Sequence, residues 1–195
     1  MLELNSTPVT RLTSFVGPVF PMTEGLLLKV NSPRPIIPLM EEIYLNKLKS
    51  FFEKDTCQKG ASPLKEGVEI EIFVNKEGPV TLKKEKDKTS ILNSAPKNPD
   101  ITCHIPEKGL ELLLENAPED LAEVGVHITK LLIHSDPDTR IKLKVHIGLF
   151  TFIKNGYFGI LPLGGPSFMK FLATKGLSSI GRIKEIISNL RDHSK

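Results

Sequence analysis

Long hydrophobic runs are missing from this sequence, which has only two cysteines and no tryptophan. A transmembrane helix needs roughly 18 or more consecutive apolar residues; no stretch is that long, so we expect no membrane span. Prolines interrupt the N-terminal region, and no basic segment precedes an apolar run, so we expect no signal peptide. Cys57 and Cys103 are too few for a disulfide scaffold or a four-cysteine zinc site. We therefore expect a cytoplasmic protein.

The sequence also lacks a large excess of charge of either sign. The chain has 26 basic and 23 acidic residues, a formal net charge of +3, whereas a dedicated nucleic-acid binder carries a concentrated basic excess. We therefore expect no nucleic-acid partner. The hydrophobic share of 39% is too high for a disordered chain. A length of 195 residues favours one domain with an appended terminal element.

The first third of the chain predicts an arm, a helix and a loop. Six prolines in residues 1–38 predict an extended N-terminal arm with one short strand at Gly25–Val30. From Leu39 to Lys54, apolar residues recur at helical spacing between charged ones, which predicts an amphipathic helix. Glycines and prolines in Thr56–Gly67 predict a loop.

Alternation of apolar and polar residues predicts the strands. The alternation is strictest in residues 68–74 and 140–147. Turns at Asn75–Gly78 and Glu85–Lys88 predict an antiparallel meander through 79–84 and 89–92. A further strand is predicted at 101–105, where Ile101, Cys103 and Ile105 alternate with polar residues and Pro106 follows.

Helices are predicted on either side of the last strand. Before it lie a short helix at 107–115 and a longer one that begins near Pro118 and ends near His134. Residues 149–163 are the least polar region of the chain, and two further helices are predicted at 166–175 and 178–191. Antiparallel strands without regular strand–helix alternation indicate the α+β class.

Two short motifs carry a resemblance to a known family. The segment Asp100–Leu110 is similar to the strand that runs into a helix in the sterol carrier protein-2 (SCP2) family. Residues Asp136–Thr139, followed by Lys142–Val145 and then the apolar Gly148–Ile153, are similar to that family's late turn, final strand and closing segment. The resemblance covers roughly residues 39–163, whereas the arm and residues 164–195 fall outside it.

The SCP2 resemblance implies both a fold and a function. The implied fold is a single, mostly antiparallel five-stranded sheet covered on one face by helices, with the extra helices of residues 164–195 packed on the domain. The implied function is non-catalytic binding or transfer of a fatty acyl chain, sterol or other lipid in an apolar cavity between sheet and helices. We expect no catalytic residue, cofactor or metal. The C-terminal peroxisomal tripeptide typical of the family is absent.

The predicted ligand-binding residues are large apolar side chains of the sheet and of the segment after it. Each of them is also compatible with an ordinary filled core, because periodicity alone does not distinguish a hollow interior from a packed one. The set consists of Ile70, Ile72, Ile101, Cys103, Leu143, Val145, Leu149, Phe150 and Phe152.

Two alternatives stay open at this point. Residues 166–195 contain six basic and two acidic side chains, so these helices are candidates for contact with an anionic membrane, with a partner protein or with a second copy in a homodimer. An enzyme acting on acyl substrates would have to use His127, His134 or Ser135, which lack the spacing of a zinc helix or a nucleophile elbow. Cys103 and His104 are adjacent on a strand and point to opposite faces, which disfavours a shared metal.

Overall fold

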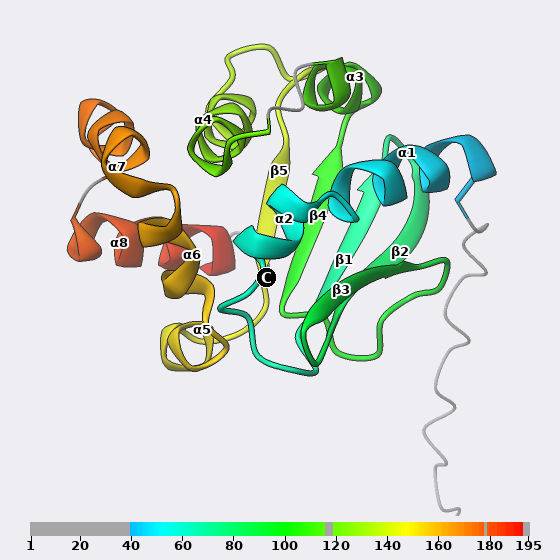
Figure 1. Cartoon of the computed structure of the whole chain (residues 1–195), viewed down its shortest axis with the longest axis horizontal. Coiled ribbons are helices and arrows are strands. Elements are labelled where there is room, and N and C mark those ends of the chain that lie inside the picture. The colour runs from blue at the N-terminus through cyan, green and yellow to red at the C-terminus, as the bar shows by residue number, and fades with distance from the viewer. Residues whose placement is uncertain (1–39, 116–118, 178, 193–195) are drawn as a thin grey trace, which may run out of the picture. The chain divides into compact units, whose positions relative to one another are not determined.

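Five strands form one mixed sheet in the computed structural model, which describes residues 40–115, 119–177 and 179–192 (Figure 1). The spatial order is β3-β2-β1-β4-β5, with β1 and β4 parallel and the other neighbouring pairs antiparallel. The strands are β1 (Glu69–Val74), β2 (Glu77–Glu85), β3 (Lys88–Leu92), β4 (Ile101–Ile105) and β5 (Lys142–Val145). The predicted mostly antiparallel five-stranded sheet and the α+β class are therefore confirmed.

The register gives the sheet one apolar and one polar face. Ile70 pairs with Leu82 of β2 and with Ile101 of β4, and Cys103 pairs with Leu143 of β5, so these side chains share a face. The opposite face carries Glu71 and Lys144, among other polar side chains. There the hydroxyl of Thr102 donates to Glu71 Oε2 at 2.7 Å and lies 2.7 Å from His146 Nε2. The apolar face is the one that helices have to cover.

Eight helices of the described residues accompany the sheet, and α1 and α2 cross in front of it in Figure 1. They are α1 (Glu42–Phe52), α2 (Asp55–Gly60), α3 (Glu107–Glu115), α4 (Leu121–Leu132), α5 (Leu149–Lys154), α6 (Tyr157–Leu163), α7 (Gly165–Thr174) and α8 (Ile180–Asp192). The amphipathic helix predicted for residues 39–54 is confirmed as α1. Its buried side chains Leu45, Leu48 and Phe51 recur at a spacing of three.

Three predictions near these helices need correction or fall outside the structure. The predicted loop Thr56–Gly67 is wrong for its first part, because α2 occupies Asp55–Gly60. α4 begins at Leu121 and not near Pro118, since the carboxylate of Asp120 accepts a hydrogen bond from the backbone N–H of Ala122 at 3.3 Å and caps the helix. The arm of residues 1–38 and its strand lie outside the described residues.

The hydrophobic core lies between the apolar face of the sheet and helices α1, α3 and α4. Leu48 of α1, Ile72 of β1 and Leu110 of α3 are each 1% exposed or less. A second cluster extends along β5 and includes Leu64, Val145 and Tyr157. The two clusters meet at Ile70 and Leu143, which pack against both.

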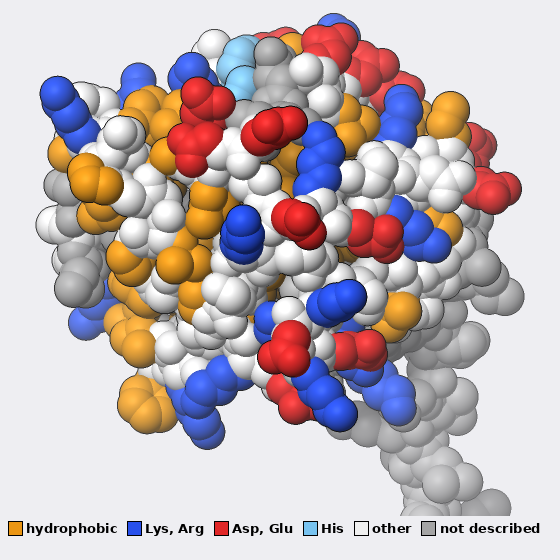
Figure 2. All heavy atoms as spheres, in the orientation of Figure 1, with side chains coloured by type: hydrophobic (Ala, Val, Ile, Leu, Met, Phe, Trp, Pro, Cys, Tyr) orange, Lys and Arg blue, Asp and Glu red, His pale blue; other side chains and the backbone are white. Residues whose placement is uncertain are grey.

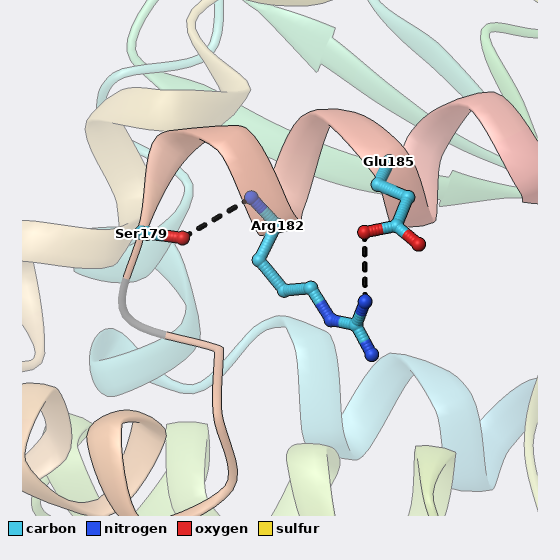
Figure 3. A network of polar contacts seen from close by, with 3 residues as sticks. All are labelled: Ser179, Arg182 and Glu185. Atoms are coloured by element: carbon cyan, nitrogen blue, oxygen red, sulfur yellow. Dashed lines mark hydrogen bonds and ion pairs between the residues drawn. The ribbon is translucent and has the colours of Figure 1, made fainter.

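The last two helices, α7 and α8, pack against α4 and against the sheet. The ring of Phe168 in α7 lies against α4, and α8 contacts β5. Figure 3 shows the first turns of α8, where the hydroxyl of Ser179 accepts a hydrogen bond from the backbone N–H of Arg182 at 3.2 Å. The helices predicted at 166–175 and 178–191 are thus confirmed as α7 and α8. No helix in the described part of the chain is long and apolar enough to cross a membrane.

Replacing Leu110 with alanine should lower the free energy of unfolding by about 3 kcal/mol, because a fully buried leucine would leave a void under the sheet. Leu92→Ala removes the same atoms at a site that is 38% exposed and should cost less than about 1 kcal/mol. Urea denaturation of both variants measures the difference. Equal losses would contradict the assignment of the core.

Candidate functional site

An apolar cavity of about 320 Å³ lies between the sheet and the helices. Its sheet wall is Ile70, Leu82 and Thr89, and the opposite walls come from α1, α2, α4, α6 and α7. The remaining lining residues are Phe51, Phe52, Cys57, Gly60, Ala61, Leu64, Leu121, Val124, Gly125, Ile128, Thr129, Ile160, Leu161, Gly164 and Phe168. Ligand cavities have volumes from about 300 Å³ upward, and an apolar cavity of about 150 Å³ admits benzene.

Few polar groups lie on the cavity wall, and most of them form hydrogen bonds within the protein. The hydroxyl of Thr129 donates to the carbonyl of Gly125 at 2.8 Å. Gln58 binds the backbone of Thr89: its amide nitrogen donates to the Thr89 carbonyl at 3.0 Å, and its amide oxygen accepts from the Thr89 N–H at 2.8 Å. Burial raises the pKa of the Cys57 thiol to about 11, against the opposing charge of Lys54. No charged side chain is among the described residues that line the cavity.

Close helix contacts made through glycine define one wall of the cavity. A Cβ atom at Gly125 of α4 would lie 2.9 Å from Cε2 of Phe168 in α7, closer than carbon atoms pack. The glycine therefore lets the Phe168 ring lie directly against α4. Phe168 is 6% exposed and Val124 on the same helix is also 6% exposed, so this wall is shielded from solvent.

A buried polar cluster holds α6 in place over the cavity. One carboxylate oxygen of Asp100, just before β4, accepts hydrogen bonds from Asn155 Nδ2 at 2.6 Å and from the Tyr157 hydroxyl at 3.1 Å. Gly156 between them has φ +89°, and a Cβ there would collide with the carbonyl of Pro63. Burial and the neighbouring Asp100 carboxylate raise the pKa of Tyr157.

Of the nine predicted ligand-binding residues, the structure brings only Ile70 to the cavity wall. Ile72 is 1% exposed inside the core. Cys103 packs against the same core, and burial raises the pKa of its thiol to about 12. Ile101, Leu143, Val145 and Leu149 belong to the cluster along β5. Contact of these side chains with a ligand stays a prediction.

The two predicted phenylalanines of α5 have different surroundings. The Phe152 ring stacks on Tyr157 at 4.4 Å between centroids and contacts Phe158 edge-on at 5.8 Å, so it supports the position of α6. Phe150 is 80% exposed and belongs to the surface. Both were predicted as ligand-binding residues because a helix of only six residues is too short for its apolar spacing to show which side chains are buried and which are exposed.

Most of the cavity-lining residues were not predicted from the sequence, although several of the helices that carry them were. Val124 and Ile128 lie in the predicted helix that ends near His134, and Phe51 and Phe52 lie in the predicted amphipathic helix of residues 39–54. A stripe predicts which face is buried but not whether a space lies behind it. The lining residues of α2 were not predicted, because the helix itself was not predicted.

His134, one of the candidate catalytic residues, and its neighbour Asp136 are engaged in a local turn. Asp136 uses its carboxylate in a turn, accepting from the backbone N–H of Asp138 at 3.0 Å and from the hydroxyl of Thr139 at 2.9 Å. These two hydrogen bonds lower its pKa. His134 accepts through Nδ1 from the N–H of Asp136 at 3.2 Å. His104 stacks on Phe73 at 4.8 Å, on the face opposite Cys103.

The described residues contain no group of three or more His, Cys, Asp or Glu that could hold a metal ion. No protein-family model and no curated protein matches the sequence. A solved structure titled "UbiJ-SCP2 Ubiquinone synthesis protein" matches 63% of this chain and 96% of its own, with 15% identity and a TM-score of 0.37. A similarity that weak establishes neither a shared fold nor a shared function.

Removing the hydroxyl of Tyr157 should destabilise the protein in a pH-dependent way. Tyr157→Phe should lower the free energy of unfolding near neutral pH by about 1–3 kcal/mol, because Asp100 loses one of two buried donors. The tyrosine pKa is raised above 10.0 on folding, so its stabilising contribution is complete below pH 10 and is lost as the pH rises further. The advantage of wild type over Tyr157→Phe should therefore shrink above pH 10.

Urea denaturation at neutral pH and above pH 10 measures this change. Tyr44→Phe removes a more exposed hydroxyl, which donates to Glu107 at 2.7 Å, and serves as the control at neutral pH. Equal stability of wild type and Tyr157→Phe, or an advantage that grows above pH 10, would refute the role given to this hydrogen bond.

Proposed function

We propose that this protein binds the alkyl part of a lipid in the cavity between sheet and helices, as a non-catalytic carrier or sensor. The observation that carries the proposal is the cavity of about 320 Å³ with an apolar lining and no charged side chain among its described lining residues. The SCP2 resemblance in the sequence implies a cavity between sheet and helices, and this one occupies that position. Affinity would come from removing apolar surface from water.

The cavity wall favours an uncharged, flexible chain as the bound part. A carboxylate or phosphate inside it would lose its hydration with no cationic lining residue to compensate, at a cost of several kcal/mol. A polar headgroup therefore remains outside the apolar part of the site. Among the described lining residues only Thr89, Thr129 and Cys57 have polar side chains, so selectivity among chains of similar length should be low.

The alternatives have weaker support. The packing of Phe168 against Gly125 uses the apolar side of α7 within the chain, which favours a structural role over docking of that side on a partner or a second copy. A hydrolase acting on acyl substrates that used His134 would need a carboxylate to orient the imidazole, and the neighbouring acidic residue is Asp136. Its carboxylate instead holds the turn to Thr139.

A side chain that fills the cavity should weaken lipid binding. Ile128→Trp should weaken binding of a fluorescent fatty acid about tenfold or more, which corresponds to about 1.4 kcal/mol, because the indole occupies the space of the chain. Fluorescence titration measures the affinity. Ala61→Phe, directly after α2, fills the cavity from another wall and replaces Ile128→Trp if that variant does not fold.

Ile133→Trp is the matched control, because Ile133 follows α4 directly and is 48% exposed. It should bind the probe like wild type. Probe binding by Ile128→Trp that equals that of Ile133→Trp would place the ligand elsewhere. A wild-type protein that does not bind the probe would refute the proposal itself.

The affinity for neutral chains should depend on their length up to a limit. For n-alkanols that displace the fluorescent probe, the dissociation constant should fall about fourfold per added methylene, equivalent to about 0.8 kcal/mol. It should become constant once the cavity of about 320 Å³ is full. Competition titrations measure this series. A dissociation constant that does not change with length would contradict burial of the chain.

A further inference from the structure

Exposed apolar side chains gather on three consecutive helices. Of the seven large hydrophobic residues exposed in the described part of the chain, four lie on α5, α6 and α7: Phe150 (80% exposed), Ile153 (50%), Leu163 (41%) and Met169 (37%). Figure 2 shows hydrophobic side chains at the surface over these helices, with basic side chains among them. Phe150, Ile153 and Lys154 are spaced i, i+3, i+4 and therefore share one side of α5.

The charged residues in this part of the sequence are all basic. Residues 139–184 contain eight lysines and arginines and no aspartate or glutamate, although the whole chain has 23 acidic residues. Lys154 on α5 and Lys170 on α7 are exposed and next to the apolar residues in sequence. A lysine can lay its alkyl stem along an apolar surface and keep its ammonium group in water. We call Phe150, Ile153, Lys154, Leu163, Met169 and Lys170 the α5–α7 surface.

α8 is less suited to bind anions than its composition predicts. Arg182 donates from Nη1 to Glu185 Oε2 at 2.7 Å, so its charge is already paired (Figure 3). The membrane contact that the sequence predicted for the basic C-terminal helices is therefore better assigned to the three helices before α8. Two of them, α5 and α6, precede the C-terminal segment 166–195.

We propose that the α5–α7 surface docks on an anionic lipid bilayer. Phe150 and Ile153 would enter the boundary between headgroups and acyl chains, and Lys154 and Lys170 would contact the anionic headgroups. Charge favours this occupant over a second copy of the chain, because a two-fold dimer through this surface would place unpaired lysines against each other. The proposal goes beyond lipid binding in the cavity and does not require it.

Docking at this surface would bring the cavity close to its lipid source. α6 carries Leu163 at the surface, whereas Ile160 and Leu161 of the same helix line the cavity. One helix therefore connects the α5–α7 surface to the apolar interior. A lipid leaving the bilayer would have to pass only this layer of helices.

Co-sedimentation of the full-length protein with vesicles tests the proposal. The protein should bind vesicles of phosphatidylcholine and phosphatidylserine, bind weakly to pure phosphatidylcholine, and dissociate as salt is raised. Phe150→Ser/Ile153→Ser should lower the partition coefficient about tenfold or more. Lys154→Glu/Lys170→Glu should lower it to a similar degree on the anionic vesicles.

The controls change exposed residues elsewhere. Ile43→Ser/Ile133→Ser, at sites 57% and 48% exposed, and Lys59→Glu/Lys130→Glu should leave the partition coefficient within about twofold of wild type. No binding to anionic vesicles, or equal losses in the control variants, would overturn the proposal. So would a wild-type dimer in analytical ultracentrifugation that Phe150→Ser/Ile153→Ser converts to a monomer, because a second copy would then cover the surface.

Discussion

The apolar face of the five-stranded sheet must be shielded from water, and the way in which it is shielded determines the rest of the structure. Its residues are too hydrophobic to face solvent. α1 and α3 pack tightly on one part of the face, where Leu48 and Leu110 are fully buried. Above Ile70 and Leu82 the cover comes from α2, α4, α6, α7 and the end of α1, which leave about 320 Å³ unfilled. Because an empty apolar space forfeits dispersion contacts, a guest that fills it would stabilise the fold as well as serve the function.

The helices over this space are held by a polar cluster outside it and by a close helix contact in its wall. Asp100 binds Asn155 and Tyr157 at the junction of α5 and α6, and Phe152 stacks on Tyr157. Gly125 sets the distance between α4 and α7 by admitting the Phe168 ring. The interior therefore needs no polar cross-links of its own, and its wall can stay apolar. The same arrangement leaves the outer sides of α5, α6 and α7 free of core packing, which is where Phe150 and Lys154 reach the surface.

The sequence predicted most elements but not the site. Strict alternation identified β1, because Glu69 and Glu71 face away from Ile70 and Ile72, and helical spacing identified α1 and α4. α2 was not predicted, because a segment of six residues that ends in Gly60 has the composition of a loop. The parallel pairing of β1 with β4 and the approach of Phe168 to Gly125 are long-range contacts with no local signature. For the same reason the predicted site residues were taken from the sheet and the segment after it, whereas the cavity wall comes largely from Val124, Ile128 and other helical residues.

The central claim is that the interior accommodates an alkyl chain. Native mass spectrometry of the full-length protein, incubated with a long-chain alcohol and freed of excess ligand, tests this most directly. The account predicts a second species, heavier by the mass of one alcohol molecule, that disappears on denaturation and is absent for Ile128→Trp. A spectrum with only the ligand-free mass, even at saturating alcohol, would show that the space between the sheet and α4 does not admit a lipid.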